Sequence, residues 1–257
     1  MPNIVVYRTS DRPTYAARSL PHLRNHTSSD CWIVVVDNPS RSETALNLDF
    51  LDETDQSMLV VRKHTRIGGP NAINEGVRAA LEEGWTPRNI FVVDDDTYVP
   101  TPQHWDGKMI FWDQCLSEML DAGWKIVGHP WSPRFTTNPP EPRPPVEIGG
   151  RRGIRMSHVA GTCSGFSRKT WHDFPIRQQT LIHGYTSWQT KVGKDAVGYC
   201  ADPYMFSVHF DRPEHPHSER DTTYDGWSNE MYWERWPVRK NRNHKAHKRP
   251  HGQQGAW

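Results

Sequence analysis

Four short runs of apolar, mostly β-branched residues recur along the first half of the chain, and each ends in polar residues. The runs cover residues 4–7, 32–36, 58–61 and 89–93. Continuous apolar runs that are too short for helices are typical of strands buried on both faces of a sheet. We therefore expect these four segments to be the central strands of a sheet.

Helical periodicity fills the intervals between the runs. After Pro13, apolar residues recur at near-helical spacing as far as Leu23, and residues 71–84 carry an apolar face that ends at Gly84. Strands that alternate with helices predict an α/β fold with a central, mostly parallel mixed sheet flanked by helices.

Residues 128–153 interrupt this alternation because they are rich in proline and glycine. Neither a helix nor a central strand tolerates that density of proline, so we predict a long surface loop with a hairpin at its end. Order is expected to return at residues 158–166, followed by a helix near 186–197 and a strand near 204–209. The pattern predicts one domain over residues 1–212 and a C-terminal extension over residues 213–257.

The composition is that of a polar globular protein. The 257 residues have a mean hydropathy of −0.81 and include 12 Trp, 21 Pro and 14 His. No apolar run approaches the roughly 18 residues of a membrane span, and the first thirty residues lack the apolar segment of a signal peptide, so we expect a cytoplasmic protein. The four cysteines form no Cys-x-x-Cys pair, which favours free, buried thiols.

The net charge of +1 is unevenly distributed. The segment from Arg235 to Trp257 carries seven Lys or Arg and no acidic residue, so this tail holds +7 and the rest of the chain −6. Basic residues interleaved with Trp233 and Trp236 are typical of single-strand nucleic-acid binding, here over residues 235–249. The alternative is a tail that folds back on the acidic body or docks on an acidic partner or anionic lipid.

Three consecutive aspartates, Asp94 to Asp96, follow the fourth apolar run directly. Ligands bind beyond the carboxyl ends of strands in open α/β sheets, and clustered carboxylates there need a positive partner. Carboxylate oxygens suit Mn²⁺ or Mg²⁺, although an acidic turn would give the same letters. A P-loop is excluded because Met109 and Asp195 follow the Gly-Lys pairs where Ser or Thr is required.

In several ordered segments the sequence resembles the nucleotide-sugar-dependent glycosyltransferases of the GT-A fold, especially family 2. The segments are Ile4 to Asp11, Val34 to Asn38, Gly68 to Gly76, Asp94 to Asp96, Gly161 to Lys169 and His209. The resemblance covers roughly residues 3 to 210, with Ile73 standing where the family usually has Arg. It implies a nucleoside diphosphate sugar as donor, with UDP as the default nucleotide.

The resemblance also implies roles for individual residues. Mn²⁺ or Mg²⁺ would be held by Asp94, Asp96 and His209, with His215 or His217 as alternatives to His209, and would neutralise the departing diphosphate. The nucleotide and donor sugar would contact Arg8, Thr9, Ser10, Asp37, Gly68, Gly69, Asn74, Asp94, Asp95, Gly161, Thr162 and Cys163. For Asp37, a turn before Pro39 is the competing interpretation.

One departure concerns the catalytic base. Many inverting members carry an acidic pair where this chain has Thr186 and Ser187, and neither can act unaided as a base. Three explanations remain open: a retaining reaction in which the departing phosphate helps to deprotonate the acceptor, a lost activity, or another carboxylate as base. The candidate carboxylates are Asp195, Asp211 and Glu214.

The acceptor is the least defined part of the prediction. Trp131 and Trp188 are candidates for stacking on an acceptor sugar or base, with core packing as the alternative. A hydroxylated base in DNA would fit the basic tail. Two rival functions are a sugar nucleotidyltransferase, whose Gly-rich signature is missing after Tyr7, and a catalytically inactive nucleotide- or nucleic-acid-binding module.

Overall fold

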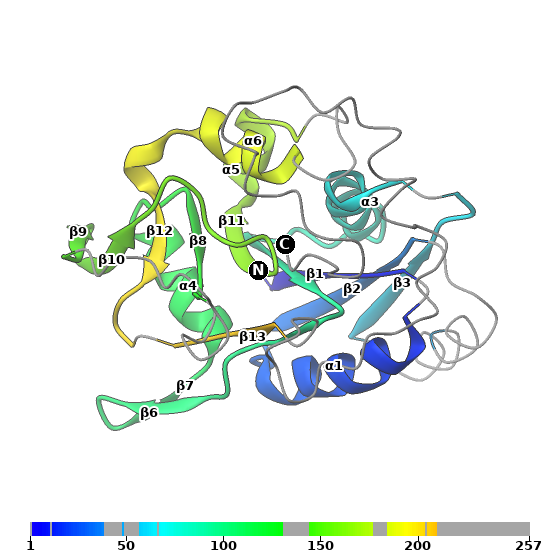
Figure 1. Cartoon of the computed structure of the whole chain (residues 1–257), viewed down its shortest axis with the longest axis horizontal. Coiled ribbons are helices and arrows are strands. Elements are labelled where there is room, and N and C mark those ends of the chain that lie inside the picture. Colours follow the sequence, from blue (N-terminus) through cyan, green and yellow to red (C-terminus); the bar gives the residue numbers. More distant parts are fainter. Residues whose placement is uncertain are drawn as a thin grey trace, which may run out of the picture.

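The structure is a computed structural model, and it describes residues 2–10, 12–38, 48, 57–65, 67–130, 144–176, 184–203 and 205–209. Its centre is a nine-stranded sheet with the order β3-β2-β1-β4-β11-β8-β12-β10-β9. Figure 1 shows this sheet running through the whole molecule, with helices on both of its faces. The expected α/β architecture is confirmed.

The first half of the sheet is parallel. It consists of β1 (Asn3–Thr9), β2 (Cys31–Asp37), β3 (Met58–Arg62) and β4 (Asn89–Asp94). All four lie where the apolar runs predicted them, and β1 is hydrogen-bonded to β2 on one side and to β4 on the other. Each strand ends at the same edge of the sheet, so the polar residues that follow them converge.

The second half of the sheet is mixed. In chain order it contains β8 (Ile126–Gly128), β9 (Val146–Ile148), β10 (Arg151–Arg155), β11 (Cys163–Ser167) and β12 (Val197–Cys200). Strand β11 runs antiparallel to β4 and β8, whereas β12 is parallel to β8. The β9–β10 hairpin confirms the turn expected at the end of the proline-rich segment.

Two small sheets accompany the large one. Strand β5 (Thr97–Tyr98) pairs with β13 (Val208–His209), and β6 (Gln103–Trp105) pairs with β7 (Lys108–Ile110) in a hairpin that projects from the molecule (Figure 1). The β5–β13 pair sets His209 opposite Thr97, one residue after the aspartate triplet.

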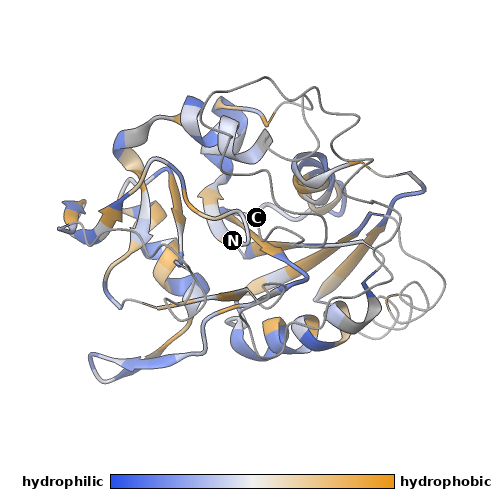
Figure 2. Ribbon diagram, in the orientation of Figure 1, coloured by the Kyte–Doolittle hydropathy of each residue, from blue (hydrophilic) through white to orange (hydrophobic). Residues whose placement is uncertain are grey.

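Helices form a layer on each face of the sheet. Helices α3 (Gly69–Glu82), α5 (Arg168–Asp173) and α6 (Gly184–Val192) lie on one face, and α1 (Pro13–His26) and α4 (Trp112–Asp121) on the other (Figure 1). Alternate residues of β1 enter the two cores, since Ile4 and Val6 pack with α3 whereas Val5 and Tyr7 pack beneath the sheet. Figure 2 shows the hydrophobic residues concentrated on these strands.

The second half of the chain also differs from the predictions. The helix expected over residues 186–197 ends at Val192, because Gly193 takes a φ of +109° and a 3₁₀ turn, Lys194–Ala196, leads into β12. Of the strand expected near 204–209, the structure describes Val208–His209. The extension over residues 213–257 lies outside the described residues. All four cysteines are buried and free, as predicted.

No helix among the residues that the structure describes is long and apolar enough to cross a membrane.

Candidate functional site

The polar residues identified in the sequence gather where the order of strand addition reverses. Strands β2 and β3 are added on one side of β1, whereas β4 pairs with its other side. Such a switch point opens a crevice at the carboxyl ends of the strands. The register sets Arg8 opposite Asp94 and Thr9 opposite Asp37, so this edge collects the first candidate residues.

Arg8 links β1, β4 and the turn before β11. Its guanidinium forms an ion pair with Asp94 and donates a hydrogen bond to the carbonyl of Gly161 at 3.2 Å. The backbone N–H of Asp94 donates to the carbonyl of Thr162 at 3.4 Å. The Asp94 side chain is 27% exposed, the most of the three aspartates. Asp94 is therefore the carboxylate of the triplet best placed to meet a ligand.

Arg12 neutralises the two inner carboxylates. Its Nη1 lies 3.1 Å from Oδ1 of Asp95 and 2.9 Å from Oδ2 of Asp96. The hydroxyl of Thr9 donates to the other carboxylate oxygen of Asp95 at 3.0 Å, and the hydroxyl of Ser19 donates to the Asp95 carbonyl at 2.7 Å. These contacts fix the backbone that carries the triplet.

The electrostatics of the triplet are those of crowded, desolvated acids. Burial raises the pKa of Asp95 to about 7 despite the opposing charge of Arg12, and repulsion from Asp96 and Asp94 adds to the rise. Arg8 and Arg12 supply two positive charges against the three carboxylates, so a further cation at this edge would be stabilised.

The glycine turn before α3 closes against the same edge. Gly68 has a φ of +76°, and a Cβ on Gly69 would lie 2.7 Å from Nη1 of Arg8, so the backbone approaches the arginine closely. Ser10 donates to the carbonyl of Asn38 at 2.5 Å. The glycine turn thus lies in contact with the end of the first strand.

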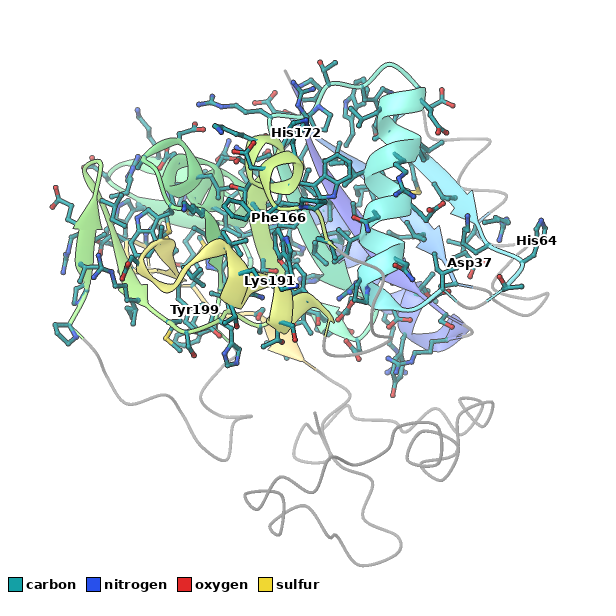
Figure 3. All side chains as sticks on the ribbon, turned by 90° about the horizontal axis from the view of Figure 1, so that it is seen from above. Asp37, His64, Phe166, His172, Lys191 and Tyr199 are labelled. Atoms are coloured by element: carbon teal, nitrogen blue, oxygen red, sulfur yellow. The ribbon has the colours of Figure 1, made fainter. Side chains whose placement is uncertain are left out.

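Asp37 lies at the end of β2 and is 3% exposed. Its carboxylate pairs with Arg62 of β3 at 3.0 Å. Figure 3 shows Asp37 near His64, far from His172 of α5. The residue is at the predicted edge, and its ion pair holds β2 and β3 together there.

Among the described residues, no three His, Cys, Asp or Glu side chains are arranged as a metal-binding group. Asp94 and Asp96 share the edge, and the backbone pairing of β13 with β5 brings His209 beside Thr97. The backbone of His209 thus lies on the strand next to the segment that carries Asp94 and Asp96.

The side chains of two predicted site residues, Asn74 and Cys163, are engaged within the fold. Both ends of the Asn74 amide are hydrogen-bonded inside the protein: it donates to the Ile176 carbonyl at 2.8 Å and accepts from the Trp171 indole at 2.9 Å. Cys163 is fully buried beneath the sheet, and burial raises the pKa of its thiol. These side chains build the scaffold instead of contacting a donor.

Trp188 is a core residue, which corrects its expected role as an acceptor platform. It is 3% exposed, and its ring packs edge-on against Phe166 with centroids 4.9 Å apart and stacks on Tyr185 at 5.4 Å. Its indole N–H donates to the carbonyl of Phe174. Large aromatic rings bury more readily than they remain exposed.

Asp195 is separated from the aspartate triplet. It precedes β12, which has the same direction as β4, and Val197 of β12 lies level with Ile90 through the pairings of β8 and β11. Asp195 therefore belongs to the amino-terminal edge of the sheet, opposite Asp94, and its predicted role as base does not fit this placement. Trp131, Asp211 and Glu214 lie outside the described residues.

Two residues of the site were not identified from the sequence. Arg12 was missed because an arginine in the loop after a strand has no distinctive sequence spacing. The acidic triplet itself indicated only that some cation must lie nearby. Tyr185, at the start of α6, lies against Gly161, and its hydroxyl is 3.0 Å from the hydroxyl of Ser164. Burial raises its pKa, so it remains a neutral hydrogen-bonding group. No sequence pattern marks it.

Comparison with known families gives a match over residues 4–173 to the family described as glycosyl transferase family 2. No curated protein sequence matches the chain. Structures that resemble this one have low sequence identity and show a shared GT-A fold.

Three of these structures illustrate the likeness. S. aureus TarS has a TM-score of 0.58 at 13% identity, covering 82% of this chain and 37% of its own. A mannosyltransferase from Pyrobaculum calidifontis, solved with GDP-Man and Mn²⁺, has 0.51 at 15%, covering 77% and 58%. GalNAc-T7, solved with UDP, GalNAc and Mn²⁺, has 0.60 at 11%, covering 87% and 46%. The chain thus matches between about a third and three fifths of these longer proteins.

Proposed function

Because the chain belongs to glycosyl transferase family 2, we propose that it transfers a sugar from a nucleoside diphosphate sugar to an acceptor hydroxyl. The observation that carries this proposal is the pair of Arg8 and partly exposed Asp94 at the switch point of the sheet. UDP is the proposed nucleotide: a TarS structure and GalNAc-T7 were solved with UDP, whereas the mannosyltransferase was solved with GDP-Man, which makes GDP the alternative.

A divalent cation fits the residues at this edge. Mg²⁺ and similar ions are commonly held by one or two carboxylates, with substrate phosphates completing the coordination. Asp94 and Asp96 would supply those carboxylates, and His209 would be the third ligand. When bound, Mn²⁺ or Mg²⁺ supplies charge neutralisation to the diphosphate. Mn²⁺ in two of the similar structures supports this assignment.

The protein's own residues would position the donor. Arg8 is held beside Asp94 and Gly161, where its guanidinium can bind a phosphate oxygen. Arg12 keeps the backbone of Asp95 and Asp96 fixed. Asp37 would accept a hydrogen bond from the nucleoside, and Gly68 and Gly69 would let the backbone approach the ligand closely.

The acceptor proton has two proposed destinations. Helix α6 contains no Asp or Glu, and Thr186 and Ser187 are exposed on it. A carboxylate outside α6, Asp211 or Glu214, would act as base in an inverting reaction. In a retaining reaction the departing phosphate would accept the proton. The anomeric configuration of the product, measured by NMR, distinguishes the two.

The test of the proposal is donor turnover by an Asp94→Asn variant. This change preserves size but removes the carboxylate charge, so we expect kcat/KM for UDP-sugar turnover with Mn²⁺ to fall at least about 100-fold. Asp173→Asn is the matched control, because Asp173 is an exposed aspartate on α5. Equal activity of the two variants would contradict the proposed site.

The acceptor is proposed to be a hydroxyl on a modified nucleic-acid base, on the strength of the basic segment 235–249. Phosphate contacts by Lys and Arg make binding weaken steeply with salt. We expect single-stranded DNA to bind the full chain in a salt-dependent manner and deletion of residues 238–257 to remove that affinity. If the deletion variant binds DNA with unchanged affinity in a filter-binding titration, the tail is not the DNA-binding segment.

A further inference from the structure

A polar cavity of about 480 Å³ lies at the edge of the sheet opposite the aspartate triplet. The amino ends of β1, β2 and β4 border it, together with α4. Its lining combines amides, hydroxyls, carboxylates, one guanidinium and one indole, contributed chiefly by Asn3, Asp30, Trp32, Arg88, Asn89, Ser117 and Asp121. The proposed transfer reaction uses none of these groups.

Asn89 is the feature that indicates a ligand. It is 1% exposed, and neither its amide nitrogen nor its amide oxygen has a hydrogen-bond partner among the described residues. Because side chains alternate along β4, Asn89 shares the face of Phe91, which packs against Trp112 of α4. The unpaired amide thus lies on the α4 side of the sheet, in the lining of this cavity. Buried amides are normally paired, so a ligand has both a donor and an acceptor to satisfy.

The neighbouring groups are held in place. Asn3 accepts the Asn89 backbone N–H at 3.2 Å and donates to the hydroxyl of Ser117 at 3.0 Å. Arg88 pairs with Asp121 at 2.5 Å across the rim. Asn3, Asn89 and Ser117 thus form a hydrogen-bonded set on three separate elements, with the mostly exposed Arg88 at the rim.

The charge of the lining indicates which ligands fit. Arg88 contributes one positive charge, whereas Asp30 and Asp121 contribute two negative charges, so the lining has a net charge of −1. An anion such as phosphate would be repelled. Carboxylates, amides and hydroxyls instead match the alternating hydroxyl groups of a neutral sugar ring. Trp32 borders the cavity from the α3 side, where its ring packs edge-on against Trp85.

We propose that this cavity binds a neutral sugar residue, with the Asn89 amide and the Asp121 carboxylate as its main hydrogen-bonding groups. The site is separate from the proposed site of transfer, because it lies at the amino-terminal edge of the sheet. Its occupancy requires neither nucleotide nor metal.

The test is ligand-observed NMR on the full chain, without nucleotide or divalent cation. The probes are the methyl glycosides of glucose, galactose, mannose and N-acetylglucosamine. We expect saturable binding in the millimolar range for at least one of them. Asn89→Leu removes both amide groups while keeping the number and branching of side-chain heavy atoms, and should weaken that binding at least about tenfold. Any affinity tag belongs at the C-terminal end, because Pro2 also lines the cavity.

Two matched variants complete the design. Asp121→Asn should weaken sugar binding, whereas Glu82→Gln changes an exposed carboxylate outside the lining and should not. Asp94→Asn should also leave sugar binding intact, which separates this proposal from the proposed function. Absence of binding by every glycoside, or equal binding by Asn89→Leu, would overturn the proposal.

Inorganic phosphate is the competing probe. An adjoining cavity of about 630 Å³ shares Arg88, Asn89 and Asp121 but adds the cationic side chains of Arg168 and Lys169. If phosphate displaces a bound glycoside, or binds when no glycoside does, the ligand class is anionic and the sugar assignment is wrong.

Discussion

Two arginines account for the way in which three adjacent aspartates are accommodated at a strand end. Arg8 pairs with Asp94, and Arg12 bridges Asp95 and Asp96. The two pairs differ in what they leave open, because Asp94 stays partly exposed whereas the inner carboxylates are covered. Asp94 is thus the more open of the two proposed metal-binding carboxylates, and Arg12 fixes the position of Asp96, the other one.

Replacing Arg12 by Gln should destabilise the fold. The change leaves Asp95 and Asp96 buried without their positive partner, and breaking a buried ion pair on one side costs about 3 kcal/mol. Urea denaturation at pH 8 should show the loss as a lower midpoint with an unchanged m-value. Arg78→Gln, at an exposed pair on α3, is the control and should change stability by less than about 1 kcal/mol.

The buried side chain of His129 should make the unfolding free energy decrease at acidic pH. It is completely buried, with Nε2 3.1 Å from the Trp112 carbonyl, and burial lowers its pKa to about 4. An unfolded His has a pKa near 6.5, so between pH 6.5 and pH 4 the unfolded state takes up a proton that the folded state refuses. Stability should therefore fall as pH drops through that window, by up to about 3 kcal/mol from this residue.

The measurement is the unfolding free energy from pH 7.5 to pH 4, compared between the native chain and His129→Gln. Gln keeps a side-chain donor but does not titrate. The variant should lose less stability across the window, whatever its stability at pH 7.5. Parallel curves would show that His129 does not contribute.

At the scale of elements, the sequence predicted those whose pattern is local. The four central strands were predicted from continuous apolar runs, and the helices after Pro13 and over residues 71–84 from apolar residues at helical spacing. The second of these helices is found at Gly69–Glu82. Helix α4 and the β6–β7 hairpin were not predicted: α4 is only ten residues long, and the hairpin exposes Trp105 and Met109. The ends of α6 and the pairing of β11 depend on contacts distant in sequence.

The site was predictable to a similar extent. Asp37 and Asp94 follow strands, so the shared edge of a parallel sheet was enough to bring them together. The placement of Asn74 depends on the face of α3 that it occupies, and that of Trp188 on the face of α6. Asp195 is placed by the end of β12 that it adjoins. The identity of a single residue does not determine any of these.

The contact between α3 and the sheet is tight at Gly76, so packing and helix propensity predict opposite changes in unfolding free energy for Gly76→Ala. Gly76 lies in α3, and a Cβ there would be 2.8 Å from Cγ1 of Val6 and 3.0 Å from Cγ2 of Val36. Propensity alone favours Ala over Gly in a helix by about 1 kcal/mol. Overpacking costs about 1–3 kcal/mol, so Gly76→Ala should lower the unfolding free energy. Glu82→Ala, exposed on the same helix, should be nearly neutral; a stabilising Gly76→Ala would mean that α3 can shift.

At the scale of the whole molecule, the sheet presents two chemically different edges. The carboxyl ends of β1, β2 and β4 gather aspartates and arginines, and the amino ends gather amides, hydroxyls and the Arg88–Asp121 ion pair. Ligands at the two edges would contact no common side chain. Their effects on stability should accordingly add, as expected for independent sites.

Nucleotide binding at the carboxyl edge should stabilise the whole fold in a metal-dependent manner. A ligand present at about 100 times its Kd adds about 2.7 kcal/mol to the folded state. For a chain of this length that corresponds to a rise in Tm of about 5–10 °C. UDP with Mn²⁺ should give this shift. UDP alone should give a much smaller one, and so should UDP with or without Mn²⁺ on the Asp94→Asn variant. Equal shifts with and without Mn²⁺ would show that the metal takes no part in nucleotide binding. A larger shift with GDP would make GDP the nucleotide. Each comparison changes only one component of the proposed complex.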